Sequence, residues 1–307
     1  MVRPVVVLRW VLPLLSIGPL VSCQLPNHHL IHPQRVPTQV ETWTEDLEQG
    51  PLLISLEWAK PVGVGPFPAV LVHPDGASTV HKMRGVVWDL ASHGYLAVAA
   101  GYRRWLRGAY RRTLFPWRTE SDVTAAVELL RAHPSADTQR LAVLGFSQGG
   151  VFSLLIAASA PDIKAVVSYY PVTDFEHWFA YRWPNPWRRW ATTVIRWYLR
   201  RQSGARNEDE FRVVLRRASP LYQAESIRAP VLLIHGERDG SAPVEESQRL
   251  AERLDALGHK VKLLVIPEGR HVFNFKQPEQ ATDAWQASLQ WLARHLRVGQ
   301  DQQPLPY

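Results

Sequence analysis

The apolar positions of the chain alternate at first and then gather into short runs that amphipathic stretches separate. Residues 39–47 and 51–58 alternate between apolar and polar side chains, which predicts two half-buried strands. Short apolar runs, each typical of a buried strand, follow at 68–73, 95–100, 141–145, 163–170, 230–235 and 260–267. Helical patterns fall near 79–93, 119–133, 149–160, 243–258 and 278–297. This alternation predicts one α/β domain with a mostly parallel sheet and helices on both faces.

One connection is much longer than such a domain needs. About 60 residues separate the strands at 163–170 and 230–235, and we predict a helical lid insertion at about 172–218. Residues 174–201 interleave arginines with Trp178, Trp183, Trp187, Trp190 and Trp197. Three interpretations stay open: the tryptophans pack on the domain, they line a substrate pocket, or they rest on anionic lipid headgroups. The basic loop 102–118 adds to the same rim, which makes a carboxylate-bearing substrate plausible.

The first residues do not follow the pattern of a folded domain. A basic start with Arg3 and Arg9 precedes a short apolar run, which predicts a signal peptide over residues 1–22. The run ends in Leu-Val-Ser before Cys23, a sequence that resembles the bacterial lipobox, where the cysteine is acylated. We therefore expect an exported lipoprotein that Cys23 anchors to the bacterial cell envelope. Residues 23–37 then form the acylated tether, 38–299 the catalytic domain and 300–307 a C-terminal tail.

Composition narrows the function classes. Of the 307 residues, 46% are hydrophobic and 21% are charged, as in soluble globular proteins. The net charge of +7 comes mainly from arginines, but no nucleic-acid-binding motif accompanies them, so we expect no nucleic-acid partner. The single cysteine excludes a disulfide within the chain. Histidines in the tether lack the spacing of a metal site, and we expect neither a metal nor a cofactor.

A candidate nucleophile lies where a strand turns into a helix. Gly145-Phe-Ser147-Gln-Gly149 matches the pattern G-x-S-x-G and follows the apolar run 141–145. On such a turn the serine hydroxyl projects above the sheet, and the glycines let neighbouring backbones come close. The helix that follows directs its positive end to the site, where it stabilises an oxyanion. Ser147 is thus the predicted nucleophile of a serine hydrolase.

A serine nucleophile needs a histidine base, which in turn needs an acid to orient it. In chains with this motif the order is serine, acid, histidine. Asp239 follows the strand 230–235 and is the predicted acid, with Glu237 as its rival. His271 lies in the loop after the strand 260–267 and is the predicted base. His235 lies inside a strand and His259 at a helix-to-strand turn, and both suit this role less well.

An oxyanion hole requires two backbone N–H donors. The first is expected from Gln148, the residue after the nucleophile. The second is expected from the turn after the strand 68–73, where Pro74 has no N–H group. Asp75 or Gly76 remains as the donor, with Asp75 preferred.

Two stretches resemble a known family. They are Ser219-Pro-Leu to Asp239, which includes the run 229–236, and Gly269-Arg-His271-Val-Phe. The chain over about 50–297 resembles the catalytic domain of prolyl-oligopeptidase-type (peptidase S9) serine hydrolases, and dienelactone-hydrolase-like esterases look similar. The resemblance implies an α/β-hydrolase fold with a mostly parallel eight-stranded sheet, and the same three residues as catalytic triad. Two departures are the nucleophile, which is a cysteine in dienelactone hydrolases proper, and the turn His73-Pro-Asp-Gly76, which is commonly His-Gly-Gly.

The resemblance also sets the expected reaction. Hydrolysis of a carboxylic ester through an acyl-enzyme is favoured, with a small-molecule ester as substrate. The alternative is a peptidase that acts on short peptides. Oligopeptidases carry a large propeller, but only about 15 residues separate Cys23 from the first strand, so we expect none here. From another class, a non-catalytic lipoprotein could keep this fold as a binding module, although the complete triad argues against it.

Overall fold

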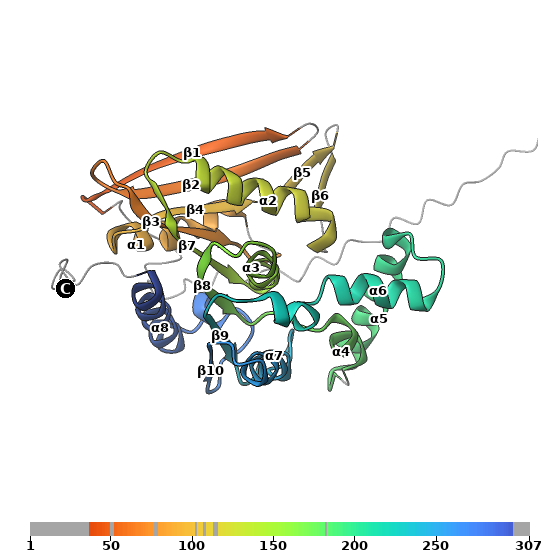
Figure 1. Ribbon diagram of the computed structural model, residues 1–307. Helices are drawn as coiled ribbons and strands as arrows, with labels where there is room; N and C mark the ends of the chain where they lie inside the picture. The colour runs from red at the N-terminus through yellow and green to blue at the C-terminus, as the bar shows by residue number, and fades with distance from the viewer. Residues whose placement is uncertain are drawn as a thin grey trace, which may run out of the picture.

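A central eight-stranded sheet organises the protein (Figure 1). The computed structural model describes residues 37–49, 52–76, 79–101, 103–106, 109–112, 116–181 and 183–296, and it describes no side chains at 47–53 and 103–122. The predicted signal peptide, Cys23 and the tail 300–307 therefore lie outside the described residues. In the part of the chain that is described, no helix is both long and apolar enough to cross a bilayer.

The strand order is β1-β2-β4-β3-β7-β8-β9-β10. The strands are β1 (Val40–Gln49), β2 (Leu52–Pro61), β3 (Phe67–His73), β4 (Leu96–Gly101), β7 (Ala136–Phe146), β8 (Ile163–Tyr169), β9 (Val231–Gly236) and β10 (Val261–Ile266). The pairs β1–β2 and β2–β4 are antiparallel, and all the other pairs are parallel. The predicted eight-stranded, mostly parallel sheet is thus confirmed. Because the parallel strands run in one direction, their carboxyl ends meet at a single rim.

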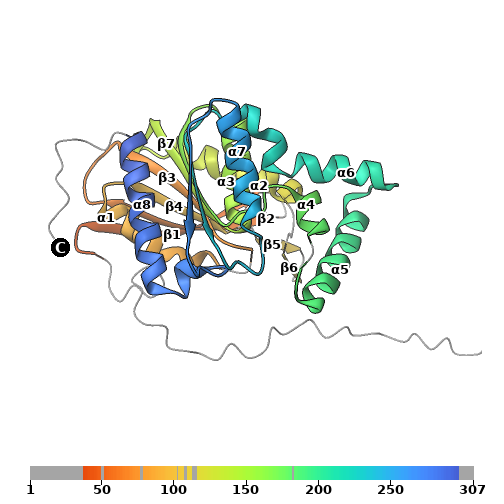
Figure 2. The same cartoon turned by 90° about the horizontal axis from the view of Figure 1, so that it is seen from below.

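Helices cover both faces of the sheet (Figure 2). Helices α1 (Arg84–Ser92) and α8 (Pro278–Leu296) pack on one face, and α2 (Pro116–Ala132), α3 (Gln148–Ser159) and α7 (Glu245–Ala256) on the other. Short 3₁₀ turns at Val80–Met83, Pro220–Ser226 and Phe273–Phe275 complete these layers. The segment after β8 forms α4 (Phe175–Ala180), α5 (Pro186–Ser203) and α6 (Glu208–Arg217).

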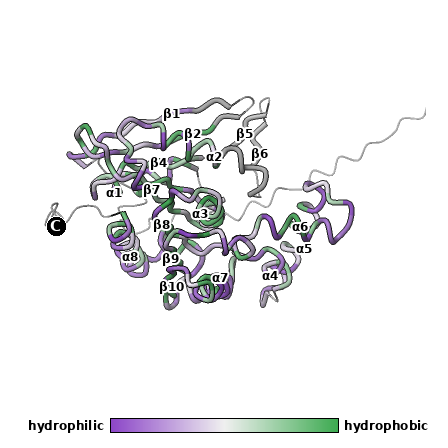
Figure 3. The backbone as a smooth tube through the Cα atoms, viewed as in Figure 1, coloured by the Kyte–Doolittle hydropathy of each residue, from purple (hydrophilic) through white to green (hydrophobic). Residues whose placement is uncertain are grey.

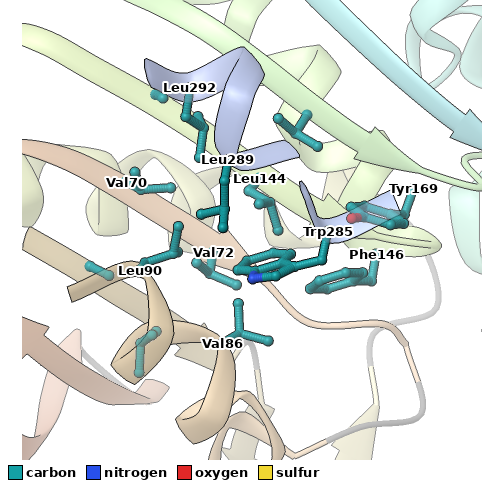
Figure 4. Packing of buried hydrophobic residues seen from close by; sticks show 14 of the residues in the cluster. Val70, Val72, Val86, Leu90, Leu144, Phe146, Tyr169, Trp285, Leu289 and Leu292 are labelled. Atoms are coloured by element: carbon teal, nitrogen blue, oxygen red, sulfur yellow. The ribbon is translucent and has the colours of Figure 1, made fainter. Parts of the chain in front are cut away.

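Strand alternation sorts the core side chains between the two faces. On β3, Val70 and Val72 face α1 and α8, whereas Ala69 and Leu71 face α2 and α3. Figure 4 shows Val70 and Val72 beside Leu144 of β7 and Trp285 of α8. Each such fully buried aliphatic side chain stabilises the fold by about 1.5–3 kcal/mol.

Helix α3 is apolar around most of its circumference, as the hydropathy colours in Figure 3 show. It is buried on two sides. Phe152 and Leu154 join the core beneath the sheet, while Val151 joins a separate cluster with Phe211 and Leu215 of α6. The insertion after β8 therefore packs on the same helix that begins at Ser147.

Two details of the sequence prediction were wrong. The basic segment 102–118 was expected to be a loop, but β5 (Arg103–Leu106) pairs antiparallel with β6 (Ala109–Arg112) within it. Strand β7 begins at Ala136, five residues before the predicted start at 141. After Ala136, residues 137–140 are polar and are half-exposed or exposed, so they lack an apolar pattern. The backbone pairing of Ala136 and Asp137 with Phe67 and Pro68 of β3 defines this part of the strand.

A close backbone contact between α3 and the end of β3 makes Gly149 sensitive to substitution. A Cβ atom on Gly149 would lie 2.2 Å from the carbonyl oxygen of His73, and one on Gly240 would have no neighbour within 4 Å. We expect Gly149→Ala to reduce the free energy of unfolding by about 3 kcal/mol, since backbone atoms must move apart. Urea unfolding of Gly149→Ala, with Gly240→Ala as the matched control, measures this loss. Equal midpoints for the two variants would contradict it.

Candidate active site

Ser147 lies on a strained turn between β7 and α3. Its backbone has φ 54° and ψ −114°, a conformation that costs a non-glycine residue about 1–3 kcal/mol. Close packing enforces it: a Cβ on Gly145 would lie 2.0 Å from the Gly149 carbonyl oxygen. The Ser147 N–H donates to the carbonyl of Tyr169 at 2.9 Å. The turn therefore holds the hydroxyl at the rim of the sheet, where the residue is half-exposed.

The three residues that the sequence predicted as a triad form one hydrogen-bonded chain. Ser147 Oγ lies 3.0 Å from Nε2 of His271, and Nδ1 of His271 lies 2.6 Å from Oδ2 of Asp239. With Nδ1–H donating to the carboxylate, Nε2 is left to accept the serine proton. Residues that are 92 and 124 positions apart from Ser147 thus meet because β7, β9 and β10 end at the same rim.

Asp239 is fixed from both of its oxygens. Oδ1 accepts the N–H groups of Ser241 at 2.7 Å and Ala242 at 2.9 Å, which leaves Oδ2 for His271. The side chain is fully buried. His235 lies 3.6 Å from Oδ2, and burial lowers its pKa, so it adds no positive charge there at neutral pH.

The alternative candidates for the acid and the base have other hydrogen-bond partners. Glu237 is exposed and its carboxylate accepts the N–H of Glu268 at 3.4 Å. His235 is buried between the hydroxyl of Ser247 at 2.7 Å and the carbonyl of Ala242 at 3.0 Å. His259 contacts the Arg228 guanidinium at 3.1 Å. None of these four contacts joins a rival residue to Ser147.

The turn expected to supply the second oxyanion donor packs beside the first. A Cβ on Gly76 would lie 2.5 Å from Oε1 of Gln148, and Asp75 is buried. Backbone N–H groups at the start of a helix lack partners within it. The turn at 74–76 and the start of α3 therefore border the same space above Ser147.

Tyr170 is a site residue that the sequence analysis missed. It is buried directly after β8, its φ is 39°, and its ring meets the His271 ring edge-on with centroids 4.8 Å apart. Its hydroxyl donates to Oδ1 of Asn274, and burial is the main cause that raises its pKa well above 10. The uncharged side chain of Tyr170 thus packs against one side of the His271 imidazole. Its place at a strand end on the rim was the only available signal.

Two hydrogen bonds join the insertion to the turn that follows Asp239. The carbonyl of Ser241 accepts hydrogen bonds from Nε1 of Trp178 at 2.8 Å and from Arg188 at 2.9 Å. Burial lowers the pKa of the Arg188 guanidinium, and the charge of Asp239 opposes that shift. The guanidinium also stacks on Trp183, 5.0 Å from the ring centroid.

A buried carboxylate holds the start of the insertion. Glu246 of α7 accepts the backbone N–H groups of Thr173 at 2.8 Å and Asp174 at 2.7 Å. It also contacts Nδ1 of His177 at 2.6 Å, and this hydrogen bond raises the pKa of His177. Together with the Ser241 contacts, this arrangement fixes α4 against α7.

Among the described residues, no group of three or more His, Cys, Asp or Glu could hold a metal ion.

Comparison with known proteins finds relatives in sequence and in fold. The uncharacterized peptidase YtmA of Bacillus subtilis is 28% identical over 221 residues, which cover 71% of this chain and 81% of that protein. A Klebsiella pneumoniae protein assigned as a dienelactone hydrolase has a TM-score of 0.60 at 22% identity, over 83% of this chain and 99% of that chain. The Pyrococcus horikoshii acylaminoacyl peptidase has a TM-score of 0.71 at 19% identity. That match covers 91% of this chain but 45% of the peptidase, so the chain spans less than half of its length.

The fold and these relatives define a serine hydrolase of the α/β-hydrolase class. More particularly, the chain belongs to the prolyl oligopeptidase family, whose family model matches residues 112–299. The resemblance noted in the sequence is thereby confirmed, for the family and for the likeness to dienelactone hydrolases.

The buried histidine below the turn at 74–76 predicts a pH effect on stability. Burial lowers the pKa of His73 to about 3, and Nδ1 lies 3.0 Å from Oγ of Ser153. In the unfolded chain the His73 imidazole takes up a proton near pH 6.5, whereas in the folded protein it does so only near pH 3. The free energy of unfolding therefore falls as the pH falls below 6.5. We expect the loss between pH 7 and pH 5 to be about 2 kcal/mol smaller in His73→Asn. Urea unfolding at both pH values measures it, and equal losses would contradict the prediction.

Proposed function

We propose that this protein hydrolyses carboxylic esters through an acyl-enzyme formed on Ser147. The observation that carries the proposal is the relay itself, with 3.0 Å between Ser147 Oγ and His271 Nε2 and 2.6 Å between His271 Nδ1 and Asp239. A serine hydroxyl becomes an effective nucleophile when a histidine can take its proton and a carboxylate holds that histidine.

The proposed reaction has two halves. Ser147 Oγ attacks the ester carbonyl carbon while its proton moves to Nε2 of His271, and the imidazolium forms beside Asp239. The oxyanion is stabilised by the backbone N–H groups of Gln148 and of Asp75 or Gly76. His271 then protonates the leaving alkoxide as the C–O bond breaks. In the second half, His271 takes a proton from water, the hydroxide attacks the acyl carbon, and the acid leaves Ser147 with its hydroxyl restored.

An ester is favoured over a peptide by the extent of the structural matches. The chain aligns with 99% of a protein assigned as a dienelactone hydrolase, and a lactone is an internal ester. It aligns with 45% of the acylaminoacyl peptidase. A short-peptide substrate is the second candidate, because the family and the relative YtmA are described as peptidases.

A matched pair of substrates tests the choice. We expect the purified protein to cleave an acyl p-nitrophenyl ester far faster than the p-nitroanilide of the same acyl group. Ser147→Ala should lower kcat for the ester by about 10⁴-fold or more, because the nucleophile is gone. Ser159→Ala, which removes an exposed hydroxyl from the same helix, is the control.

A fluorophosphonate probe completes this test, since it labels only an activated serine. Wild-type protein and Ser159→Ala should be labelled and Ser147→Ala should not. Faster cleavage of the anilide would favour the peptidase. An unlabelled wild-type protein that cleaves neither substrate would favour the non-catalytic binding module.

The location of the enzyme is a proposal from the sequence alone. We propose that Cys23 is acylated and anchors the hydrolase to the bacterial cell envelope, because the one cysteine of the chain ends a short apolar run. Cells that express Cys23→Ser should lose incorporation of radiolabelled palmitate into the protein, while Ser22→Ala should keep it. Undiminished labelling of Cys23→Ser would reject the anchor.

A further inference from the structure

Helix α5 presents aromatic side chains to solvent, the reverse of an ordinary surface helix. Trp187 is 77% exposed, Trp190 55% and Trp197 63%. Val194 and Tyr198 are also exposed, at 42% and 43%. Large apolar side chains in a contiguous exposed patch mark an interaction surface rather than ordinary variation.

These side chains share one face of the helix. Trp187, Trp190, Val194 and Trp197 follow one another at spacings of three and four residues, which keeps them on a single stripe about 15 Å long. Thr192 and Leu199 are buried on the opposite side, and Leu199 joins the cluster that contains Val151 of α3 and Phe211 of α6. We call the exposed set Trp187, Trp190, Val194, Trp197 and Tyr198 the α5 stripe.

The charged residues of α5 itself have one sign. Helix α5 contains five arginines and no acidic residue. Arg196 and Arg200 pair with Glu208 of α6, the latter at 3.8 Å. Neither Arg189 nor Arg201 forms an ion pair with another described residue, and both are exposed. The helix that carries the stripe is thus basic, and a complementary surface is anionic.

We propose that the α5 stripe docks the protein on an anionic lipid bilayer, with α5 lying flat in the headgroup region. Tryptophan and tyrosine favour this region because the ring body is apolar while the N–H or O–H group finds a polar partner. Arginines beside them attract anionic headgroups. A helix of another copy fits less well, because three indoles and Arg201 would have to share one narrow seam.

The position of α5 gives the docking a consequence for the site. Helices α4, α5 and α6 lie together on one side of the body, away from α1 and α8, in both views (Figures 1 and 2). Arg188, near the start of α5, is bonded to the carbonyl of Ser241, two residues after Asp239. Docking by the stripe would therefore hold the rim that bears the relay close to the lipid surface. The inference does not depend on which bond the enzyme cleaves.

The single cysteine of the chain allows a site-specific test. In full-length Cys23→Ser protein, Val194→Cys introduces a unique thiol on the stripe for an environment-sensitive NBD label. Val64→Cys is the matched control, since Val64 is 92% exposed and precedes the amino end of β3, whereas Ser147 follows the carboxyl end of the parallel strand β7. With vesicles of phosphatidylcholine and phosphatidylglycerol, the label at 194 should shift to the blue and the label at 64 should not.

Substitution of the stripe gives the second measurement. Trp187→Ser/Trp190→Ser/Trp197→Ser should lower the vesicle partition coefficient about tenfold or more. Val62→Ser/Val64→Ser, which removes exposed apolar groups elsewhere, should leave it unchanged. Because every variant keeps residues 1–36, their contribution cancels in the comparison. High salt or pure phosphatidylcholine should weaken binding of the parent protein.

The possible results distinguish a lipid bilayer from a second copy of the protein as the partner of the α5 stripe. Equal partitioning of the stripe variant and the control variant, or an unshifted label at 194, would overturn the proposal. A molar mass that doubles with concentration and falls back in the stripe variant would instead assign the surface to a second copy. Cleavage of a soluble short-chain ester should be the same in the parent and the stripe variant, so a failed docking test leaves the proposed reaction standing.

Discussion

The site depends on one close approach of backbone to backbone, where the start of α3 passes under the turn after β3. Gly149 meets the carbonyl of His73, and Gly145 meets the carbonyl of Gly149, at distances that leave no room for a side chain. This contact forces Ser147 into its strained conformation and sets the turn at 74–76 beside Gln148. The proposed nucleophile and the proposed oxyanion donors are thus positioned by close backbone packing at the rim of the sheet.

The sequence predicted the parts of the fold that leave a periodic pattern. The strands and helices of the sheet followed from alternation and apolar runs, and the order of Ser147, Asp239 and His271 followed from where those strands end. The hairpin of β5 and β6 was missed, because basic and aromatic residues in its four-residue strands give no clear period. The polar start of β7 was missed for a similar reason.

The contacts that hold the site in place were beyond sequence reasoning. Tyr170 packs on His271 from 101 positions away, and Glu246 anchors backbone groups more than 70 positions before it. Each is an ordinary residue type at an ordinary place in its own segment. Their roles exist only once the rim brings separate loops together, and a single sequence carries no local mark of that meeting.

The insertion has two faces with different surroundings. Its inner side, with Trp178, Trp183 and Arg188, packs on the turn that follows Asp239. Its outer side leaves three tryptophans in solvent. The sequence interpretation treated the five tryptophans as one group, whereas burial divides them into two.

The shared acceptor at Ser241 limits how this enzyme can be re-engineered. One carbonyl oxygen links the insertion to the loop whose N–H groups also fix the acid, so a transplanted insertion without an indole and a guanidinium at these points would loosen the carboxylate as well. Libraries meant to change selectivity would retain activity best by varying the outer side of α5 and keeping Trp178 and Arg188. The inner side of the insertion therefore tolerates fewer substitutions than its distance from the hydroxyl of residue 147 would suggest.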